Sequence, residues 1–337
     1  MADFSKDYQV VYSAEYDACT ISFRCFDTPN SVTVFGACEM GGDVEDVLLD
    51  VRRACLEFHR LWSFSLAGSD IARLNEPVGS VNVDARTAQL LSAMKAFHDE
   101  EPMFDFTVGP VSFMWKHASR APSDVELVAA LEHVGANKVS IEGSTVLKAD
   151  PLVKVDVGGA AKGFVADSIV ALLRGAGVKS ADIDLGGNIY MLGEHPSGRA
   201  WRVAVRVPKG IDVERPIVEV RNRSVVTSGS YERFVEIDGK RYQHIVDPQT
   251  GRPSETDIVS ATVVAKSSLA ADMMATTALL GGTTCLDGLK ARHPGVSLIV
   301  ITAAGAVLET GEWPRGGGPA YDQPKCGNPR NRRSYQG

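Results

Sequence analysis

One segment near the middle of the chain changes its periodicity at a pair of glycines, and this change constrains the fold more than any other feature. Residues 153–157 alternate apolar and charged side chains, as a half-buried β-strand does, whereas residues 160–174 repeat their apolar side chains at helical spacing. Gly158 and Gly159 join the two parts. Such a junction leaves backbone N–H groups unpaired at the positive end of a helix, where glycine lets a phosphate approach closely.

Side chains of opposite charge flank this junction. Asp156 precedes the glycines and Lys162 follows them. A magnesium-bound diphosphate needs both signs of charge, because the metal prefers oxygen ligands and phosphate oxygens need cations or amide donors. The glycines fit neither the G-x-G-x-x-G dinucleotide pattern nor a G-x-x-x-x-G-K-[ST] P-loop. This segment alone is therefore compatible with a phosphate site and with a purely structural turn.

Composition and charge bound the class of protein. The chain has 337 residues, of which 44% are hydrophobic and 23% charged, as is ordinary for a globular protein with a sizeable core. A net charge of -7 argues against binding along a nucleic-acid backbone, which needs a basic surface. The six cysteines show no C-x-x-C spacing, so we predict neither a zinc site nor a redox pair.

The two ends of the chain give expectations about location and domain organisation. The N-terminus has neither a basic nor an apolar signal region, and no run approaches about eighteen apolar residues. We therefore expect a cytoplasmic protein without a membrane span. Residues 315–337 are rich in Gly, Pro, Asn and Arg and predict a disordered tail. Residues 1–314 are expected to form a single domain, because the chain has neither internal repeats nor a Ser/Pro linker.

The remaining periodicity predicts an α+β fold in which mixed sheets pack with helices. Two strand–Gly-Gly units, at 153–159 and 182–188, bracket one helix, so we expect both glycine turns in the same half of the fold. Further strands are expected at 9–13, 19–25, 201–207, 225–234, 242–246, 258–264 and 296–301, with a Gly-Pro turn at 109–110. Further helices are expected at 43–62, 70–75, 84–99, 123–135 and 268–280.

A few polar residues in apolar surroundings are candidates for chemistry, each with an alternative. Asp272 and Thr276 are four residues apart on an expected helix, so their oxygens share one face and can hold one divalent cation; the helix dipole alone also favours an aspartate there. His244, expected on the returning strand of a hairpin, is either a satisfied structural residue or a general base. Asp105 and Thr107 either cap the following segment or belong to a site.

Taken together in their order, seven blocks of the sequence resemble those of the ApbE-type FAD:protein FMN transferases. They lie within about residues 45 to 310. The blocks are 69–75 (SDIARLN), 104–110 (FDFTVGP), 156–163 (DVGGAAKG), 184–188 (DLGGN), 227–233 (TSGSYER), 244–251 (HIVDPQTG) and 271–276 (ADMMAT).

The resemblance implies a Mg²⁺-dependent transfer of FMN from FAD to a Thr or Ser hydroxyl of an acceptor flavoprotein, with release of AMP. It implies metal ligation by the side chains of Asp272 and Thr276 and by the carbonyl of Gly159. His244 would help to remove the hydroxyl proton, and Arg233 would steady phosphate charge. The residues implied at the FAD site are Ser65, Met103, Phe104, Asp105, Asp156, Lys162, Ile258 and Val259.

Some positions depart from the family pattern. The nearest match to the Met-Gly-Thr of the family's first strand is Ala18-Cys19-Thr20. Ser65 stands where the family has an aromatic residue, so ring stacking there is either absent or supplied by Phe64. The chain lacks the export signal of many members, so its acceptor is expected in the cytoplasm or facing it. It also lacks an S-G-A-T-like acceptor sequence, which argues against self-flavinylation.

Two other functions remain open on the sequence. The first is a magnesium-dependent FAD hydrolase, in which water replaces the acceptor hydroxyl and FMN and AMP are released. The second is a non-catalytic flavin-binding protein, against which the presence of His244, Asp272 and Thr276 speaks. The transferase chemistry agrees with the residues, because phosphoryl transfer needs mainly positioning and charge neutralisation.

Overall fold

The computed structural model describes residues 7–231 and 234–311. Its largest element in this range is a nine-stranded sheet in which each neighbouring pair runs antiparallel. In spatial order the strands are β1 (Tyr8–Ser13), β2 (Ala18–Cys25), β3 (Thr28–Phe35), β7 (Ala181–Leu185), β8 (Asn188–Leu192), β11 (Arg223–Gly229), β14 (Ile258–Ala265), β15 (Ser297–Thr302) and β16 (Val307–Thr310). The predicted α+β class is confirmed.

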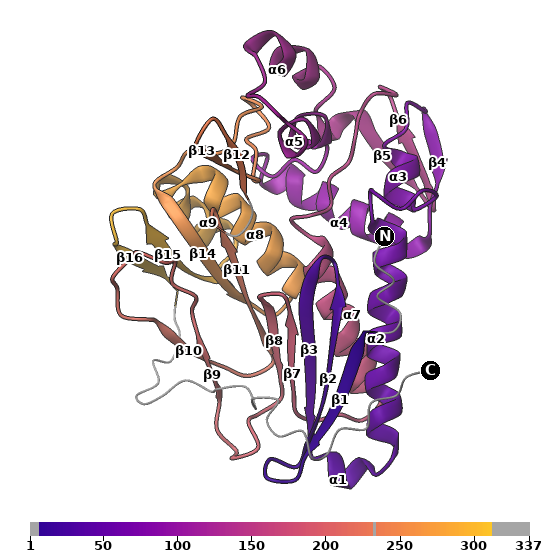
Figure 1. Cartoon of the computed structure of the whole chain (residues 1–337), viewed down its shortest axis with the longest axis vertical. Coiled ribbons are helices and arrows are strands. Elements are labelled where there is room, and N and C mark those ends of the chain that lie inside the picture. The colour runs from indigo at the N-terminus through magenta and orange to yellow at the C-terminus, as the bar shows by residue number, and fades with distance from the viewer. Residues whose placement is uncertain (1–6, 232–233, 312–337) are drawn as a thin grey trace.

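Helices pack on one face of this sheet, and a small two-stranded sheet covers the other (Figure 1). The first face carries the long core helices α2 (Asp43–Trp62), α7 (Ala161–Gly175) and α8 (Ser268–Gly281). The second face meets β9 (Trp201–Ala204) and β10 (Ile217–Val220), with Trp201 fully buried between them and the large sheet. The large sheet therefore has two apolar faces, and the helical face carries the larger core.

Shorter elements surround this framework. A three-stranded sheet has the order β4 (Ser80–Asn82), β6 (Thr145–Lys148) and β5 (Val139–Glu142). A hairpin is formed by β12 (Phe234–Ile237) and β13 (Lys240–Gln243). The remaining helices are α1 (Ala37–Met40), α3 (Asp70–Leu74), α4 (Ala85–Glu100), α5 (Gly109–Lys116), α6 (Asp124–Leu131) and α9 (Leu286–Arg292).

Local sequence signals placed several of these elements correctly. The helix predicted at 43–62 is α2, which buries the apolar stripe that its spacing indicated. Asp84 caps α4 through the N–H of Arg86, and Ser123 opens α6 with the predicted capping box. The turn between β12 and β13 has positive φ at Asp238 (52°) and Gly239 (76°), as a tight hairpin requires.

Several predicted elements are wrong or shorter than expected. The strand predicted at 201–207 ends at Ala204, and the strand predicted at 242–246 ends at Gln243. Gly109 and Pro110 do not form a turn but begin α5, where proline suits the first helical positions. The helix predicted at 123–135 ends at Leu131. The segment 153–157 is no strand: apart from one isolated parallel bridge between Val108 and Lys154, it lies outside the ladders of the described residues.

The segment 153–157 nevertheless keeps the alternating burial that its sequence indicated. Val153, Val155 and Val157 are buried, while the charged residues between them are partly exposed. Its backbone is paired with a neighbouring loop, since the N–H of Asp156 donates to the carbonyl of Phe106 at 2.8 Å. Alternation reports which side chains are buried and not which partner the backbone has, so a single extended segment gave the pattern of a strand.

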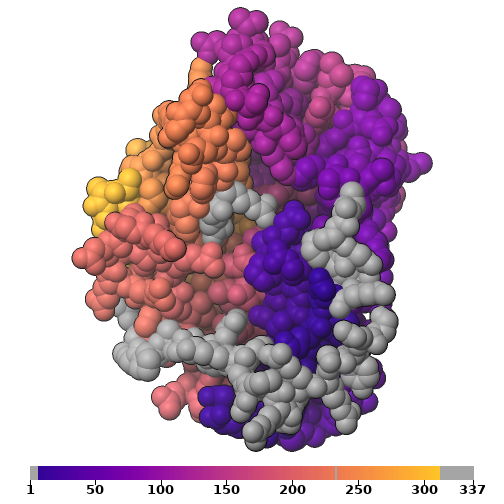
Figure 2. Space-filling view, viewed as in Figure 1, coloured from indigo at the N-terminus to yellow at the C-terminus, as the bar shows by residue number. Residues whose placement is uncertain are grey.

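A separate small core lies where α5 and α6 meet the β12–β13 hairpin. In the space-filling view, these elements meet near the top of the molecule, where purple and orange atoms touch (Figure 2). It contains Val111 and Trp115 of α5, Leu127 of α6, and Ile237 of the hairpin. The indole N–H of Trp115 donates to the carbonyl of Gly251 at 2.8 Å. This cluster fixes the region that follows β13, where His244 lies.

Two further predictions concern the membrane and the chain ends. Among the described residues, no single helix has the length and apolar composition to cross a membrane, although the strongly bent pair Ser268–Gly281 and Thr283–Arg292 meets that test jointly. The predicted tail at 315–337 lies outside the described residues. The division into a domain at 1–314 and a tail stays a prediction.

Candidate active site

The N-terminal ends of α7 and α8 lie side by side, and each helix caps the other. The N–H of Gly163, in the first turn of α7, donates to Oδ2 of Asp272 in α8 at 2.9 Å. In return, Asp167 of α7 accepts from the N–H groups of Ser268 at 2.8 Å and Leu269 at 3.1 Å. The positive ends of two helix dipoles are thereby brought together. The first N–H groups of α8 are bound by Asp167 and Ser267, so the α7 end is the one that would attract an anionic ligand.

Glycine permits the close approach of these helices. A Cβ atom on Gly163 would lie 2.5 Å from the carbonyl oxygen of Ser268, which is closer than real side chains come. A Cβ on Gly159 would lie 3.0 Å from Oγ1 of Thr276 and 3.2 Å from the ring of Phe104. The glycine turn therefore lies directly against the helix face that carries Thr276, although Gly163 and Asp272 are 109 residues apart in the sequence.

The oxygen atoms gathered here are those that a hard cation prefers. Asp272 is only 4% exposed, and its neighbours Ala271 and Ala275 are small and buried. Oγ1 of Thr276 donates to the backbone carbonyl of Asp272 at 3.2 Å. Across residues 7–231 and 234–311 there is no cluster of three or more His, Cys, Asp or Glu side chains. A metal at this face would therefore rely on one carboxylate, a hydroxyl, a main-chain carbonyl and ligand oxygens, a set that fits Mg²⁺.

The second glycine turn lies near the first, which confirms the prediction that both fall in the same half of the fold. Nζ of Lys162 donates to the carbonyl of Gly186 at 3.3 Å. Asp184 accepts from the N–H of Gly187 at 2.7 Å. Burial raises the pKa of Asp184, and the nearby cations Arg206 and Lys162 partly offset that rise. Lys162 thus stands between the two turns.

Asp156 and Asp105, both predicted at the FAD site, are held differently. Asp156 folds back on its own turn, accepting from the N–H of Gly158 at 2.9 Å and from the hydroxyl of Ser112 at 2.8 Å. Asp105 accepts from the N–H of Thr107 at 2.8 Å and from the N–H of Ala136 at 3.2 Å. The contacts of Asp105 are those of the capping alternative, while those of Asp156 fix the entry to the glycine turn.

Met103 and Phe104 belong to the loop after α4, which is held by contacts with α4 and α9. Phe104 is buried edge-on against Phe97 at 5.3 Å and touches the glycine turn through Gly159. Met103 approaches the C-terminal end of α8 at Gly281. Glu101, at the start of the loop, accepts two bonds from Arg292 at 2.6 and 2.7 Å. This buried carboxylate ties the loop to α9.

Ile258 and Val259 begin β14 at an irregularity in its pairing with β15. Ile258 is buried, whereas Val259 is partly exposed. The carbonyl of Val259 accepts from the N–H of Ser230, in the loop after β11, at 3.1 Å. The register shift turns this short stretch out of the regular ladder, as bulges at strand ends near sites often do.

His244 lies in a bend directly after β13, one residue beyond the strand on which it was predicted, and its side chain is exposed. The next residue connects this bend to α8: the carbonyl of Ile245 accepts from the N–H of Ser254 at 2.9 Å, and the hydroxyl of Ser254 donates to the carbonyl of Leu279 at 3.2 Å. Arg233, the other predicted catalytic residue, lies outside the described residues.

Ser65 and Phe64 lie in the exposed loop after α2. Ser65 makes a contact of 3.1 Å between its hydroxyl and that of Ser63. The ring of Phe64 lies 5.4 Å from that of Phe113, and Nζ of Lys116 lies 3.5 Å above it. An exposed aromatic ring is therefore present next to Ser65, on the α5 side that also supplies Ser112 to Asp156.

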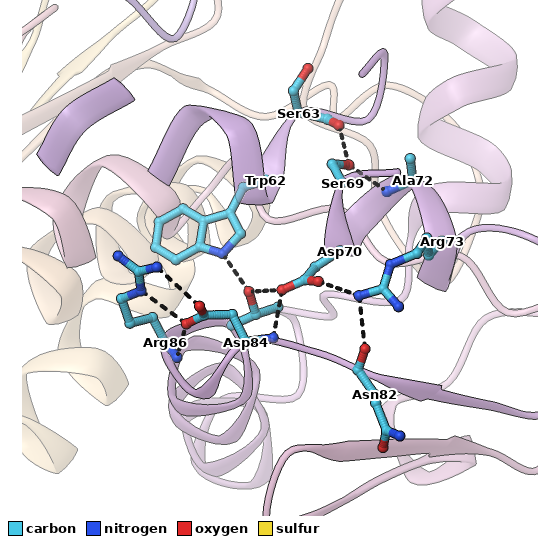
Figure 3. A network of polar contacts seen from close by, with 10 residues as sticks. Trp62, Ser63, Ser69, Asp70, Ala72, Arg73, Asn82, Asp84 and Arg86 are labelled. Atoms are coloured by element: carbon cyan, nitrogen blue, oxygen red, sulfur yellow. Dashed lines mark hydrogen bonds and ion pairs between the residues drawn. The ribbon is translucent and has the colours of Figure 1, made fainter. Parts of the chain in front are cut away.

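The sequence predicts no role for single residues of the SDIARLN block. In the structure, polar residues of this block belong to one hydrogen-bond network (Figure 3). Asp70 is buried and accepts from the hydroxyl of Thr87 at 2.6 Å, from the N–H of Asp84 at 2.8 Å and from Arg73 at 2.5 Å. Thr87 in turn accepts from the indole of Trp62 at 3.0 Å. The network fixes the start of α3 to the start of α4.

Sequence reasoning also missed Thr28. A Cβ atom on Gly186, which has a positive φ of 62°, would lie 2.6 Å from Thr28 at the start of β3. Ala18 and Cys19 are buried at the other end of that hairpin, where Ala18 pairs with Phe35. The end of the hairpin that reaches the second glycine turn is therefore the Phe26–Thr28 end, and not Ala18-Cys19-Thr20.

Comparisons with known proteins point in one direction. The model of the ApbE family matches residues 26–300, a range that begins at Phe26 and leaves out Ala18-Cys19-Thr20. An FAD:protein FMN transferase of Vibrio cholerae is 32% identical over 250 residues, which are 71% of this chain and 75% of the relative. One from Treponema pallidum is 36% identical over 256 residues, or 69% of this chain and 70% of the relative.

Solved structures agree with the sequence relatives. The flavin transferase ApbE from Vibrio cholerae superposes with a TM-score of 0.78 at 25% identity, covering 87% of this chain and 96% of that one. The ApbE protein from Thermotoga maritima gives a TM-score of 0.78 at 25% identity and covers 90% and 97% of the two chains.

Proposed function

The chain belongs to the ApbE family, and from this premise we propose that it transfers FMN from FAD to a Thr or Ser hydroxyl of an acceptor protein, with Mg²⁺ required and AMP released. One observation carries the proposal: the glycine turn, the Asp272–Thr276 face and the N-terminal ends of two helices meet at one place. A diphosphate bound there would find the positive end of α7, Lys162 and oxygen ligands for a metal.

The proposed chemistry divides among a few residues. Asp272, Thr276 and the carbonyl of Gly159 would hold Mg²⁺, which when bound neutralises charge on the diphosphate. Lys162 and the N-terminal end of α7 orient the phosphates. His244 takes the proton of the acceptor hydroxyl, whose oxygen then bonds to the FMN phosphorus. The phosphoanhydride bond breaks, AMP leaves with its electron pair, and FMN remains attached through a phosphoester.

The residues proposed to line the FAD site lie around the same glycine turn and the neighbouring strand. Met103 and Phe104 lie on the side of the glycine turn that faces α8, and Ile258 and Val259 lie at the start of the neighbouring strand. Asp105 would act by fixing this loop through its backbone contacts. Phe64, and not Ser65, offers a ring for stacking.

Incubation of the protein with FAD, Mg²⁺ and a flavoprotein domain that carries a Ser/Thr acceptor site tests the proposal. We expect a fluorescent flavin band on the acceptor after denaturing electrophoresis, an adduct of FMN mass, and AMP in equal amount. EDTA and an acceptor with its hydroxyl residue changed to Ala serve as controls. Release of AMP and free FMN without labelled acceptor would instead identify a hydrolase, and stable FAD without AMP a binding protein.

The acceptor's location belongs to the same proposal. We expect the acceptor and this protein together in the cytoplasm or at its membrane face. Fractionation of cells followed by in-gel flavin fluorescence measures this directly. A labelled acceptor found only outside the cytoplasmic membrane would contradict it.

A further inference from the structure

The segment that leads into the glycine turn is extended but is not held by a regular ladder. Across the described residues, the pairing of 151–157 with any strand is limited to the bridge at Lys154. Asp156 lies in this segment and Gly159 follows two residues after its end, so their positions depend on whatever fixes the backbone just before them. Besides the backbone bonds of Lys154 to Gly109 and of Asp156 to Phe106, the side chains of Asn75 and Lys148 do this.

Lys148, the last residue of β6, is buried with 5% exposure and is surrounded by main-chain carbonyls. Its Nζ lies 2.7 Å from the oxygen of Leu74 and 2.9 Å from those of Glu76, Pro151 and Val153. An ammonium has only three N–H donors, so four acceptors saturate it. The cation thus ties the loop after α3 to the beginning of the extended segment.

The charged form of Lys148 is the one that this cage suits. Burial lowers the pKa of Lys148, and the charge of nearby Asp150 opposes that shift. Four carbonyl dipoles directed at one nitrogen favour a cation, and a neutral amine would leave buried carbonyls without donors. The cage is therefore a built-in cation site whose occupant is the protein's own side chain.

Asn75 completes the attachment two residues further along. Its Oδ1 accepts from the N–H of Val155 at 2.7 Å, and its Nδ2 donates to the carbonyl of Val155 at 3.0 Å. Asn75 follows directly after Leu74, whose carbonyl binds Lys148. The start of the same short helix is fixed by Asp70 (Figure 3).

The geometry points to a positioning role for Asn75 and Lys148, which together we name the 75/148 clamp. We propose that the clamp holds the backbone at 151–155 so that Asp156 keeps its contact with Ser112 and Gly159 stays against the face of Thr276, and that it thereby sets the affinity for Mg²⁺ and the diphosphate without touching either. The inference rests on the proposed function of this site. It gives a role in the site to two further residues. Asn75 is 80 positions away from Val155, and Lys148 is 5 positions away from Val153.

Substitutions of Asn75 test the clamp. Asn75→Asp keeps the acceptor for the N–H of Val155 but replaces the donor to its carbonyl by a second oxygen, and Asn75→Ala removes both. Outer-shell groups that orient metal ligands are typically worth about 10- to 100-fold in metal affinity. We expect the Mg²⁺ concentration for half-maximal AMP release to rise by about that factor, with kcat at saturating Mg²⁺ changed much less.

Lys148→Ala allows a rescue experiment. The change removes three carbons and the ammonium group, which n-propylammonium supplies as one molecule. We expect the variant to need more Mg²⁺ than the wild type and to regain part of its Mg²⁺ affinity in n-propylammonium chloride. The same concentration of n-propanol with NaCl should not restore it. Lys148→Met, which fills the space without charge, should not recover Mg²⁺ affinity.

Two measurements do not depend on turnover. Calorimetric titration of FAD in the presence of Mg²⁺ reports affinity, and amide hydrogen exchange of peptides covering 151–160 reports how firmly the segment is held. Val203→Ala, a core change on the opposite face of the large sheet, is the matched control for loss of stability alone. It should lower thermal stability without changing exchange at 151–160 or the Mg²⁺ requirement.

The outcomes separate the two proposals. Unchanged Mg²⁺ affinity and unchanged exchange at 151–160 in the Asn75 variants would overturn the clamp, even if they melt earlier. If Lys148→Ala does not fold, the two Asn75 variants decide alone. A wild-type protein that binds FAD and Mg²⁺ but never releases AMP would refute the proposed function, while binding and exchange would still decide the clamp.

Discussion

The two sides of the candidate site are built in opposite ways. On the α7–α8 side, the helices cap each other through Asp167 and Asp272, and Asp272 is buried while Thr276 is partly exposed. On the β12–β13 side, a two-stranded hairpin exposes Phe234 at 43% and presents His244 to solvent. The first side is part of the main core, and the second belongs to the small cluster around Trp115.

This difference fits the two halves of a group transfer. Stabilising the charge of a reacting diphosphate requires groups that are fixed before the substrate arrives, because reorganising them during the reaction would cost free energy. A hydroxyl on another protein has to reach the same phosphorus from outside, which requires an open surface. The buried side is therefore expected to set affinity for the nucleotide and metal, and the exposed side to serve the acceptor.

The strongest test of the buried side compares its two capping aspartates. Asp272→Asn and Asp167→Asn each keep an acceptor for a helix N–H but remove the charge. We expect Asp272→Asn to abolish Mg²⁺-dependent AMP release, a loss above the roughly 100-fold typical of outer-shell changes. Asp167→Asn should lower stability by less than about 2 kcal/mol and keep the Mg²⁺ dependence. Equal Mg²⁺ titrations for both variants would remove Asp272 from the metal site.

The exposed side is tested at His244. Loss of a general base typically slows a reaction by about 100- to 10,000-fold, so His244→Ala should lose transfer to that extent. FAD affinity, measured by calorimetry, should be unchanged because the proposed nucleotide contacts lie on the buried side. His195→Ala, near Trp201 on the opposite sheet face, is the control. If FAD binding falls together with transfer, His244 contacts the ligand or supports the fold.

Close packing of the two helices is tested by adding one methyl group. Gly163→Ala places a Cβ against the backbone of Ser268 and Leu269, and such overpacking typically costs about 1–3 kcal/mol. Gly175→Ala, at the other end of α7, meets open space and is the matched control, with an expected gain of up to about 1 kcal/mol. Chemical denaturation measures both. Equal stability of the two variants would show that the helices can separate without cost.

The smallest expected effect concerns pH and the second glycine turn. Because burial raises the pKa of Asp184, the native state holds its proton more tightly than the unfolded chain does. Its contribution to stability is therefore fully present below the ordinary pKa of 3.8 and is lost as pH rises through the raised value. Asp184→Asn, which can still accept from Gly187, should flatten this decline. Denaturation midpoints of the wild type and the variant are measured from about pH 4 to 8. If the midpoint falls with pH at the same slope in both proteins, the expectation is contradicted.

Much of the local structure could be predicted because its causes are local. The apolar spacing of residues 43–62 gives α2 without reference to any partner, and Ser123 and Glu126 define the start of α6 between themselves. Asp238-Gly239 gives a hairpin because both positions tolerate positive φ. The order of the motif blocks identified the family, which the comparisons bear out over residues 26–300.

Where prediction failed, the deciding partner was distant in the sequence. The alternation at 153–157 is real, but the carbonyl of Phe106, the side chain of Asn75 and the link that Lys148 makes to Leu74 hold that segment where a neighbouring strand was expected. Thr28 escaped notice because only the folded chain places it against Gly186. Neither contact has a period or a composition that a sequence pattern could reveal.

By itself, the sequence determined which segments form helices and hairpins and which chemical groups the chain carries into its site. The tertiary structure decided that α7 and α8 meet at their N-terminal ends and that Asp167 and Asp272 exchange caps. It also decided that Asn75 binds the backbone of Val155, 80 residues away, and that Lys148 joins Val153 to the carbonyl of Leu74, which lies 74 residues before the lysine. The reason is physical: helix and turn formation depend on neighbours within a few residues, whereas buried polar groups take whichever partner the folded chain brings within hydrogen-bonding distance.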